Sequence, residues 1–303
     1  MSKYAVIDCG TNTFHLLIAQ AKKEGGFKEI YRERRYIKLA EEGIQTIGRQ
    51  AYQRAIKALQ DYAQIIQKHK VINTRVSGTA ALRTASNGYE LVEEAAISTG
   101  LKIDIIPGDA EAQLIYKGVE QAIGLQEDRW MIMDIGGGSV EFIIVDNQGV
   151  RWFESFPIGV AVTYKHFHKK EPISEEEITH LETFLAGQLA NLHTALLRYP
   201  TSHLVGAAGT FDVIGNVLGM QKDTPYSTTI KLDGFPPFYT RLIRASQKER
   251  HLMSDIPDDR ADMIVVALIL VDYIIKLAEI NRLTVSDFSM KEGMLSEMML
   301  AEY

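Results

Sequence analysis

Short apolar segments alternate along the chain with longer segments in which apolar residues recur at helical spacing. Residues 4–7, 14–19, 74–77 and 202–206 have the composition of short strands. The apolar positions of residues 52–66 recur every three or four residues, which predicts an amphipathic helix. Strands that alternate with helices indicate an α/β fold.

Residues that favour helix ends mark where several helices should begin. Ser174 and Glu177 form a capping box ahead of a helical pattern that continues to Leu192. Asp109 is expected to cap a helix that follows a predicted strand at residues 102–106. We also expect a strand within residues 29–39, a helix that begins after Asn87, and helices at residues 261–278 and 291–300.

One motif occurs twice in the chain. The segment VIDCGTNTFHLLIA begins at Val6, and IMDIGGGSVEFIIV begins at Ile132. Each combines a strand, Asp-x-Gly, three polar or glycine residues and a second strand. The two aspartates, Asp8 and Asp134, are 126 residues apart, which is about the length of one domain. The repeat predicts two similar β-hairpins, one in each domain, that face each other across a cleft.

Glycine-rich turns of this kind can bind anions through their backbone N–H groups, and glycine allows a ligand to approach closely. A single copy would be explained better as a simple hairpin with glycine in its turn. Two copies favour a cleft that binds a chain of phosphates. Other phosphate motifs do not fit, because no Walker A pattern is present and Glu141 occupies the last position that G-x-G-x-x-G would require.

Composition narrows the class of protein further. A chain of 303 residues is long enough for two domains. Its net charge of −6 argues against general nucleic-acid binding. The single cysteine, Cys9, cannot form an internal disulfide, and no secretory signal is evident, so we expect a cytoplasmic protein. The most apolar segment, residues 263–271, is too short to span a membrane.

Six motifs resemble, in order, those of the exopolyphosphatase / guanosine pentaphosphate phosphatase family. They are AVIDCGTNTFHLLIA, GTAALRTASN, IIPGDAEAQLIYKGV, MDIGGGSVEFIIV, GAAGTFDVIG and FSMKEGML. The resemblance implies two ribonuclease H-like domains of the actin, hexokinase and Hsp70 superfamily with an active-site cleft between them. We expect the first domain to comprise residues 1–115 and 288–303, and the second residues 116–287.

The same resemblance implies an activity. It implies hydrolysis of terminal phosphoanhydride bonds with Mg²⁺ or another divalent cation, with inorganic polyphosphate or guanosine pentaphosphate as the substrate. Whether the protein forms a homodimer is left as an open alternative. Larger members of the family carry an added C-terminal HD-type domain, for which this chain is too short.

Glu111 is the candidate general base. Spacing alone would make it an ordinary solvated glutamate in the first turn of a helix, where the helix dipole favours its charge. The resemblance assigns the catalytic glutamate to this position. Hydrolysis of a phosphoanhydride requires a carboxylate that can accept a proton from a positioned water.

Candidate metal ligands and phosphate contacts surround the two repeated loops. Asp134 and Glu141 flank the glycines and suit Mg²⁺, with Asp8 sharing the metal or holding its water; Asp134 could instead bond to N–H groups of its own turn. The resemblance assigns Arg83 to a substrate phosphate. Further phosphate contacts are expected from Thr11, Asn12, Thr13, Gly136, Gly137, Gly138, Ser139, and from Gly209 and Thr210 at the start of a helix.

Some features leave alternatives open. We expect His15 to be structural, and the basic cluster His166, His168, Lys169 and Lys170 to be a solvated helix end rather than a polyanion track. The chain has Val140 and Ala110 where the family usually has threonine and glutamate. These two departures keep a phosphate or nucleotide-binding regulator without turnover as a hypothesis beside the hydrolase. A sugar or acetate kinase-type phosphotransferase is the other hypothesis, and Glu111 in place of a sugar site argues against it.

Overall fold

The computed structural model describes residues 2–22, 26–124, 126, 128–207 and 209–301. The chain divides into two compact units. The first comprises Met1–Gly118 with Met290–Tyr303, and the second comprises Val119–Ser289. Each unit is described by itself below.

The first unit is built on a mixed sheet with the strand order β3-β2-β1-β4-β5. β1 pairs antiparallel with β2 and parallel with β4, so the sheet changes direction at β1. The apolar residues of β1 and of β2 up to Ala19 are buried, which explains their short, dense apolar runs. The strands are β1 (Lys3–Cys9), β2 (Thr13–Ala21), β3 (Phe27–Tyr36), β4 (Asn73–Gly78) and β5 (Ile103–Ile105).

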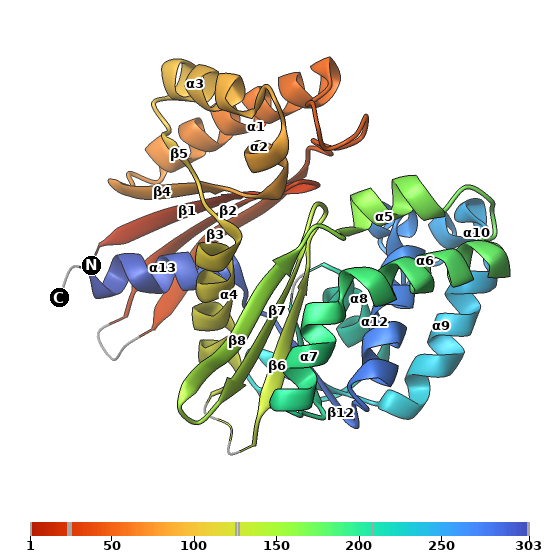
Figure 1. The fold of residues 1–303 in the computed structure, drawn as a ribbon. Helices are drawn as coiled ribbons and strands as arrows, with labels where there is room; N and C mark the ends of the chain where they lie inside the picture. The colour runs from red at the N-terminus through yellow and green to blue at the C-terminus, as the bar shows by residue number, and fades with distance from the viewer. Residues whose placement is uncertain (1, 23–25, 125, 127, 208, 302–303) are drawn as a thin grey trace. The chain divides into compact units, whose positions relative to one another are not determined.

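Helices cover both faces of this first sheet (Figure 1). On one face lie α1 (Arg49–Lys68), α2 (Ala80–Thr84) and α3 (Gly88–Thr99), and α13 (Met290–Leu300) packs against β1 and β2 on the other. α4 (Gly108–Ile123) begins in this unit, and Gly293 of α13 lies so close to the Leu114 carbonyl that a methyl group would collide with it. Apolar residues of α1 and the sheet form the core.

The second unit has the sheet order β10-β11-β12-β9-β6-β7-β8. Its part β8-β7-β6-β9-β12 repeats the order and the directions of the first sheet, with β6 in the place of β1. The strands are β6 (Trp130–Ile135), β7 (Val140–Asp146), β8 (Gly149–Phe156), β9 (His203–Ala207), β10 (Gly219–Thr224), β11 (Ser227–Ile230) and β12 (Arg282–Ser286). The predicted α/β class with a repeated domain is confirmed.

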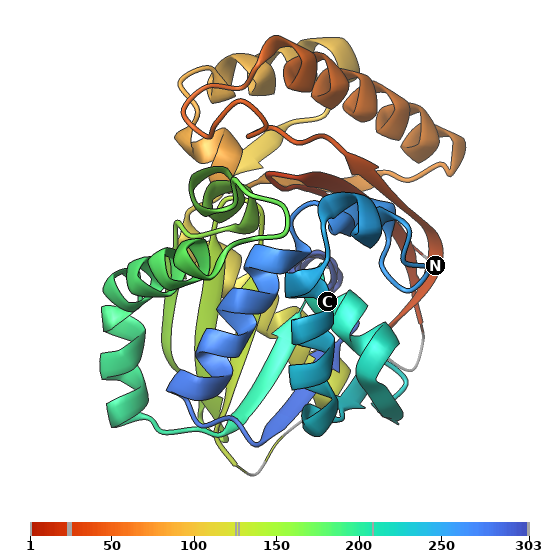
Figure 2. The ribbon, with the colours of Figure 1, turned by 90° about the vertical axis from the view of Figure 1, so that its right-hand side faces the viewer.

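The helices of the second unit lie on one face of its sheet, around α12 (Figure 2). α12 is almost wholly apolar and forms the centre of the larger core. The helices are α5 (Val160–Phe167), α6 (Glu175–Gln188), α7 (Ala190–Arg198), α8 (Thr210–Leu218), α9 (Phe235–Arg244), α10 (Gln247–His251), α11 (Asp258–Ala261) and α12 (Ile264–Leu277), with a 3₁₀ turn at Leu232–Gly234.

Helix boundaries differ from the sequence-based expectation in three places. The predicted capping box of Ser174 and Glu177 is confirmed, but the helix it starts ends at Gln188 and a second helix follows. α12 begins at Ile264, three residues later than expected. α4 begins at Gly108, so Asp109 lies inside its first turn instead of capping it.

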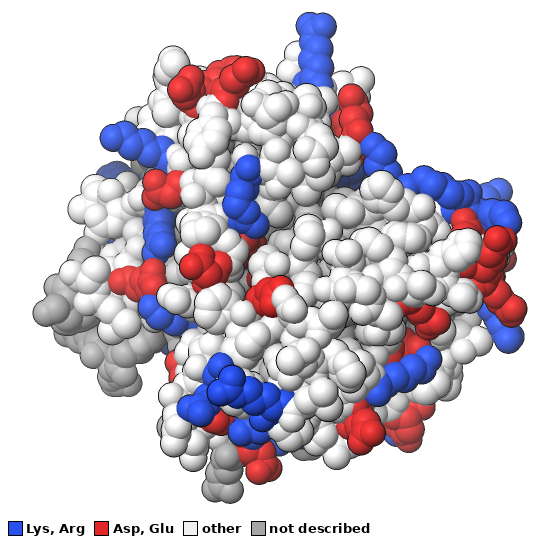
Figure 3. All heavy atoms as spheres, viewed as in Figure 1, with Lys and Arg blue, Asp and Glu red and all other residues white. Residues whose placement is uncertain are grey.

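Charged residues of both signs are interspersed on the face drawn in Figure 3. This arrangement agrees with the modest net charge of −6. None of the helices in the described part of the chain combines the length and the apolar character needed to cross a bilayer.

His203 is a buried histidine at the start of β9. Its Nε2 lies 3.0 Å from the Thr284 hydroxyl oxygen on the neighbouring strand. Burial lowers the pKa of His203 to about 4, and the positive charge of Arg282 acts in the same direction. The ring is therefore neutral in the folded protein and becomes charged first in the unfolded chain.

We therefore expect the second unit to lose stability as the pH falls from about 6.5 to about 4, because the unfolded state binds a proton that the folded state does not. The contribution of His203 should approach about 3 kcal/mol at the acid end of this window. Urea unfolding at several pH values checks this. His203→Gln should flatten the dependence, whereas the exposed control His193→Gln should not. An equal slope in His203→Gln and the wild type would contradict the assignment.

Candidate functional site

The two repeated loops form the same closed turn. In the first unit, the N–H of Gly10 donates to the carbonyl of Thr13 at 3.0 Å. In the second, the N–H of Gly136 donates to the carbonyl of Ser139, also at 3.0 Å. A methyl group on either glycine would lie 2.9 Å from that carbonyl oxygen, so a larger residue does not fit without a shift of the turn.

The turn carbonyls are held by the segment that follows the third strand of each sheet. In the first unit, Leu39 N–H donates to Thr11 O at 2.8 Å, and Ile37 N–H donates to Asn12 O at 2.9 Å. The two units use the same arrangement, so the repeat extends beyond the hairpin itself. In the second unit the donors are Gly159 to Gly138 O (3.3 Å), Val160 to Gly136 O (3.0 Å) and Ala161 to Gly137 O (2.9 Å).

The glycine turn keeps three backbone donors for a ligand. Among the described residues, no acceptor binds the N–H groups of Gly137, Gly138 and Ser139. Consecutive free N–H groups in a turn form a concave anion-binding site. The chemistry that this turn supports best is therefore the binding of phosphate oxygens.

Two buried carboxylates stand beside this turn. Asp134 on β6 is directly opposite Glu141 on β7, and the residues are 7% and 1% exposed. Ser289 donates to Asp134, and Ser155 donates to Glu141 at 2.6 Å. Like charges directly opposite each other destabilise a sheet, unless a cation or hydrogen bonds compensate them.

This pair fits Mg²⁺ better than it fits a metal held entirely by protein. The described residues contain no cluster of three or more histidine, cysteine or acidic side chains arranged to hold a metal. Mg²⁺, however, commonly uses one or two carboxylates and completes its shell with water and substrate phosphates. Asp134 and Glu141 supply such a pair.

The first unit carries a different side chain at the equivalent position. Asp8 is opposite His15, whose Nε2 lies 3.0 Å from the Thr13 hydroxyl oxygen. Burial, followed by the charge of Asp8, raises the pKa of the Cys9 thiol well above its usual range, so Cys9 is a packing residue and not a nucleophile. Within the described residues, the buried hydroxyl of Thr11 has no hydrogen-bond partner.

Glu111 lies in the first turn of α4 and is only 7% exposed. The expectation of a first-turn position is confirmed, but the side chain is not a solvated one. Arg83, from the last turn of α2, places Nη1 3.4 Å from Glu111 Oε2 and 2.5 Å from the Ile106 carbonyl. Its Nε and Nη2 groups have no partner in the described part of the chain, so they can bind a substrate oxygen.

Gly209 and Thr210 open α8 as predicted. Gly209 has a φ of 40°, which favours glycine, and Thr210 is buried. A methyl group on Gly209 would lie 3.1 Å from Arg260 Nη1, so a guanidinium stands at this helix start. Ala208 of the same motif lies outside the described residues.

Three residues that contact the candidate site were not assigned from the sequence: Ser155, Ser289 and Arg260. Ser289 lies in the FSMKEGML motif, which was a usable signal. Ser155 and Arg260 give no such signal, because only strand pairing and helix packing bring them to Glu141 and Gly209. The site residues form one set in each unit.

Comparisons with known proteins agree with these features. Residues 17–302 match the model of the Ppx/GppA phosphatase family. The crystal structure of an exopolyphosphatase from Cytophaga hutchinsonii is 32% identical, with a TM-score of 0.94 over 99% of this chain and 98% of that one. A Ppx/GppA family member from Aquifex aeolicus is 25% identical, with a TM-score of 0.81 over 99% and 98% of the two chains.

A guanosine-5'-triphosphate,3'-diphosphate pyrophosphatase from Vibrio vulnificus is 28% identical over 305 aligned positions, which include 98% of this chain. The chain spans 59% of the length of that relative. The fold is thus that of a two-unit α/β phosphatase with a repeated glycine-containing turn. The chain belongs to the Ppx/GppA phosphatase family.

Gly159 gives a direct test of the glycine turn. A methyl group at Gly159 would collide with the backbone of Gly137 and Gly138. We expect Gly159→Ala to displace the turn, to destabilise the protein by about 1–3 kcal/mol and to lower phosphatase activity more than about tenfold. Thermal unfolding and steady-state kinetics measure both effects.

Gly187→Ala is the matched control. Gly187 lies in α6 with open space around its Cβ position, so alanine should raise stability by up to about 1 kcal/mol and leave activity unchanged. Equal activity of the Gly159→Ala and Gly187→Ala variants would show that the turn does not depend on this contact.

Proposed function

We propose that this protein is an exopolyphosphatase that hydrolyses the terminal phosphoanhydride bond of inorganic polyphosphate and releases orthophosphate. The observation that carries the proposal is the glycine turn, whose three free N–H groups adjoin the buried pair Asp134 and Glu141. Family membership supports the same reaction class. A chain of phosphates offers the closely spaced anionic oxygens that such donors bind.

Glu111 is proposed as the general base. A water oxygen attacks the terminal phosphorus, the bond from that phosphorus to its bridging oxygen breaks, and the water proton passes to the Glu111 carboxylate. Burial of Glu111 limits competing water, and the Arg83 guanidinium nearby places positive charge beside the carboxylate. The leaving group is the shortened polyphosphate.

The phosphate contacts follow from the available donors. Arg83 would bind a substrate oxygen through its Nε and Nη2 groups, and the N–H groups of Gly137, Gly138 and Ser139 would bind others. Further contacts are assigned to the loop residues Thr11, Asn12, Thr13 and Gly136 and to Gly209 and Thr210 at the start of α8.

Mg²⁺ is the proposed cofactor, with Asp134 and Glu141 as its ligands and Asp8 as a further contributor. A bound Mg²⁺ neutralises phosphate charge and polarises a phosphoryl oxygen. The Ser289 and Ser155 hydroxyls orient the two carboxylates of the second unit.

Guanosine pentaphosphate is the second candidate substrate. The Vibrio relative, named for this activity, supports it, although the chain spans only part of that relative's length. The Arg260 guanidinium beside Gly209 adds positive charge where a second phosphate group of a nucleotide could bind. Phosphate release from polyphosphate, guanosine pentaphosphate and ATP separates these hydrolases from a kinase-type enzyme and from a regulator without turnover.

Glu111→Gln tests the base. It keeps the shape of the side chain and removes its basicity, so we expect polyphosphate hydrolysis to fall by about 10²-fold or more while substrate affinity stays similar. Single-turnover rates and equilibrium binding report the two quantities separately. The control is Asp109→Asn in the same helix turn, which is exposed and should retain activity. A near wild-type rate for Glu111→Gln would place the base elsewhere.

The metal assignment is tested by the Mg²⁺ concentration that gives half-maximal activity. Asp134→Asn and Glu141→Gln should each raise it by about tenfold, because each removes one charged ligand. Glu154→Gln is the control, since Glu154 lies next to Ser155 but bonds to the exposed Asn191. An unchanged Mg²⁺ dependence in both site variants would remove the pair from the metal site.

A further inference from the structure

α5 connects the glycine turn with a buried ion pair at its other end. At its start, the N–H groups of Gly159, Val160 and Ala161 hold the three turn carbonyls. These N–H groups belong to the first turn of a helix or its cap, where no carbonyl of the same helix is available. The helix has eight residues, so its far end lies about 12 Å away.

That far end is closed by His168, which is not the solvated residue that the sequence suggested. Its side chain is only 1% exposed, and its ring packs edge-on against Tyr164 with centroids 5.1 Å apart. Nε2 lies 3.1 Å from Glu171 Oε1, but the alignment does not form a hydrogen bond. Burial lowers the pKa of His168; Glu171 opposes this effect and Arg250 adds to it.

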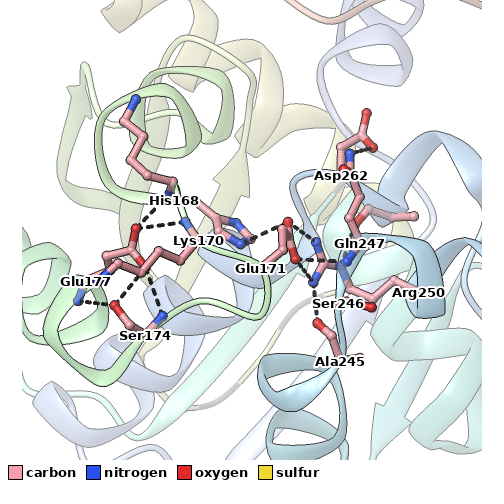
Figure 4. A network of polar contacts seen from close by, with 12 residues as sticks. His168, Lys170, Glu171, Ser174, Glu177, Ala245, Ser246, Gln247, Arg250 and Asp262 are labelled. Carbon is pink, nitrogen blue, oxygen red and sulfur yellow. Dashed lines mark hydrogen bonds and ion pairs between the residues drawn. The ribbon is translucent and has the colours of Figure 1, made fainter.

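Glu171 is bound by Arg250, a fully buried charge of this unit (Figure 4). Arg250 is fully buried, and its Nη1 and Nη2 donate to the two carboxylate oxygens of Glu171 at 3.1 and 2.9 Å. Arg250 also donates to the carbonyls of Ala245 and Ala261, at 2.6 and 2.8 Å. The N–H of Gln247 is a further donor to Glu171, at 2.8 Å.

The segment between α5 and α6 is fastened at a second point. The carboxylate of Glu177 accepts hydrogen bonds from the N–H groups of Lys169, Lys170 and Ser174. Burial alone would raise the pKa of Glu177, but the hydrogen bonds lower it to about 2, so the group stays ionised. The segment after α5 therefore has fixed contacts to both α6 and α10.

We propose that Arg250 and Glu171 are positioning residues for phosphate binding: by fixing the far end of α5, they hold its first turn against the carbonyls of the glycine turn. The expected effect on kinetics rests on the proposed function. The structural connection from the ion pair through α5 to the glycine turn does not. Among the described residues, neither side chain makes a hydrogen bond to the glycine turn, and α5 is the element that joins their segment to it.

The test compares Glu171→Gln with Asp255→Asn. The control pair, Arg241 and Asp255, is also a two-bond arginine–carboxylate pair of the second unit, but it lies at the surface and, among the described residues, makes no hydrogen bond to α5. Hydrogen–deuterium exchange of the peptide covering residues 157–163 reports on the link without any substrate. We expect exchange there to accelerate about tenfold in Glu171→Gln and to stay unchanged in Asp255→Asn.

The kinetic consequence is measured on the same proteins below their unfolding temperatures. Glu171→Gln should raise KM for polyphosphate by about three- to tenfold while kcat stays within about twofold. The Kd for tripolyphosphate, used as a short-chain probe of binding, should rise by the same factor. Lower thermal stability with unchanged exchange at 157–163 and unchanged KM would show a merely structural ion pair and overturn the inference. If exchange accelerates in the variant but the wild type neither binds nor hydrolyses polyphosphate, the proposed function is refuted and the structural connection stands.

A milder variant covers the case in which Glu171→Gln does not fold. Gln247 is the first residue of α10, where proline is well tolerated, and Ser246 before it is already extended. Gln247→Pro removes the N–H that donates to Glu171 and keeps the Arg250 pair; Gln247→Ala, which keeps the N–H and loses the same side-chain bond to Asp262, is its control. This variant should also accelerate exchange at residues 157–163 and raise KM, but by smaller factors. If neither quantity changes, the inference is overturned.

Discussion

Backbone hydrogen bonds decide which groups of the glycine turn can meet a ligand. A turn has as many carbonyl oxygens as N–H groups, and exposed carbonyls would repel phosphate. Here the carbonyls of Gly136, Gly137 and Gly138 are bound by the start of α5, and Ser139 O is bound by Gly136 N–H. The remaining N–H groups are then the only main-chain dipoles of the turn left for an anion, among the described residues.

This constraint accounts for the glycines themselves. Gly136 lies against the Ser139 carbonyl, and Gly159 lies against the turn from the other side. The three consecutive glycines therefore reflect close packing of one backbone segment on another as well as access for a ligand. The first unit closes its turn with Gly10, and there the carbonyls of Thr11 and Asn12 accept hydrogen bonds from residues 37–39.

The sequence predicted the parts of the site that repeat. The 126-residue spacing between Asp8 and Asp134 identified both turns, and the dense apolar runs identified the central strands. Only the basic end of α5 was expected, and its start at the glycine turn was not predicted, because eight residues give little periodicity. The polar hairpin of β10 and β11 was missed because most of β10 is exposed and lacks an apolar face.

Arg250 shows why the remainder could not be predicted. In the segment SQKERH it has the appearance of a surface residue of a short helix, and its burial depends on Glu171, which is 79 residues away in the chain. Pairings of this kind follow from tertiary packing and leave no local pattern. The same holds for Ser289, whose bond to Asp134 joins residues 155 positions apart.

The two units share one turn but differ in the residue opposite its aspartate, and this difference underlies the separate roles that we propose for them. In the second unit Glu141 opposes Asp134, which concentrates negative charge and suits a divalent cation. In the first unit His15 opposes Asp8 and bonds to Thr13, so no second carboxylate stands there. The first unit instead supplies Glu111 and Arg83. The repeated turn is thus surrounded by different side chains in the two units: two opposed carboxylates in one, and in the other a glutamate beside a guanidinium, which we propose as the general base and a phosphate ligand.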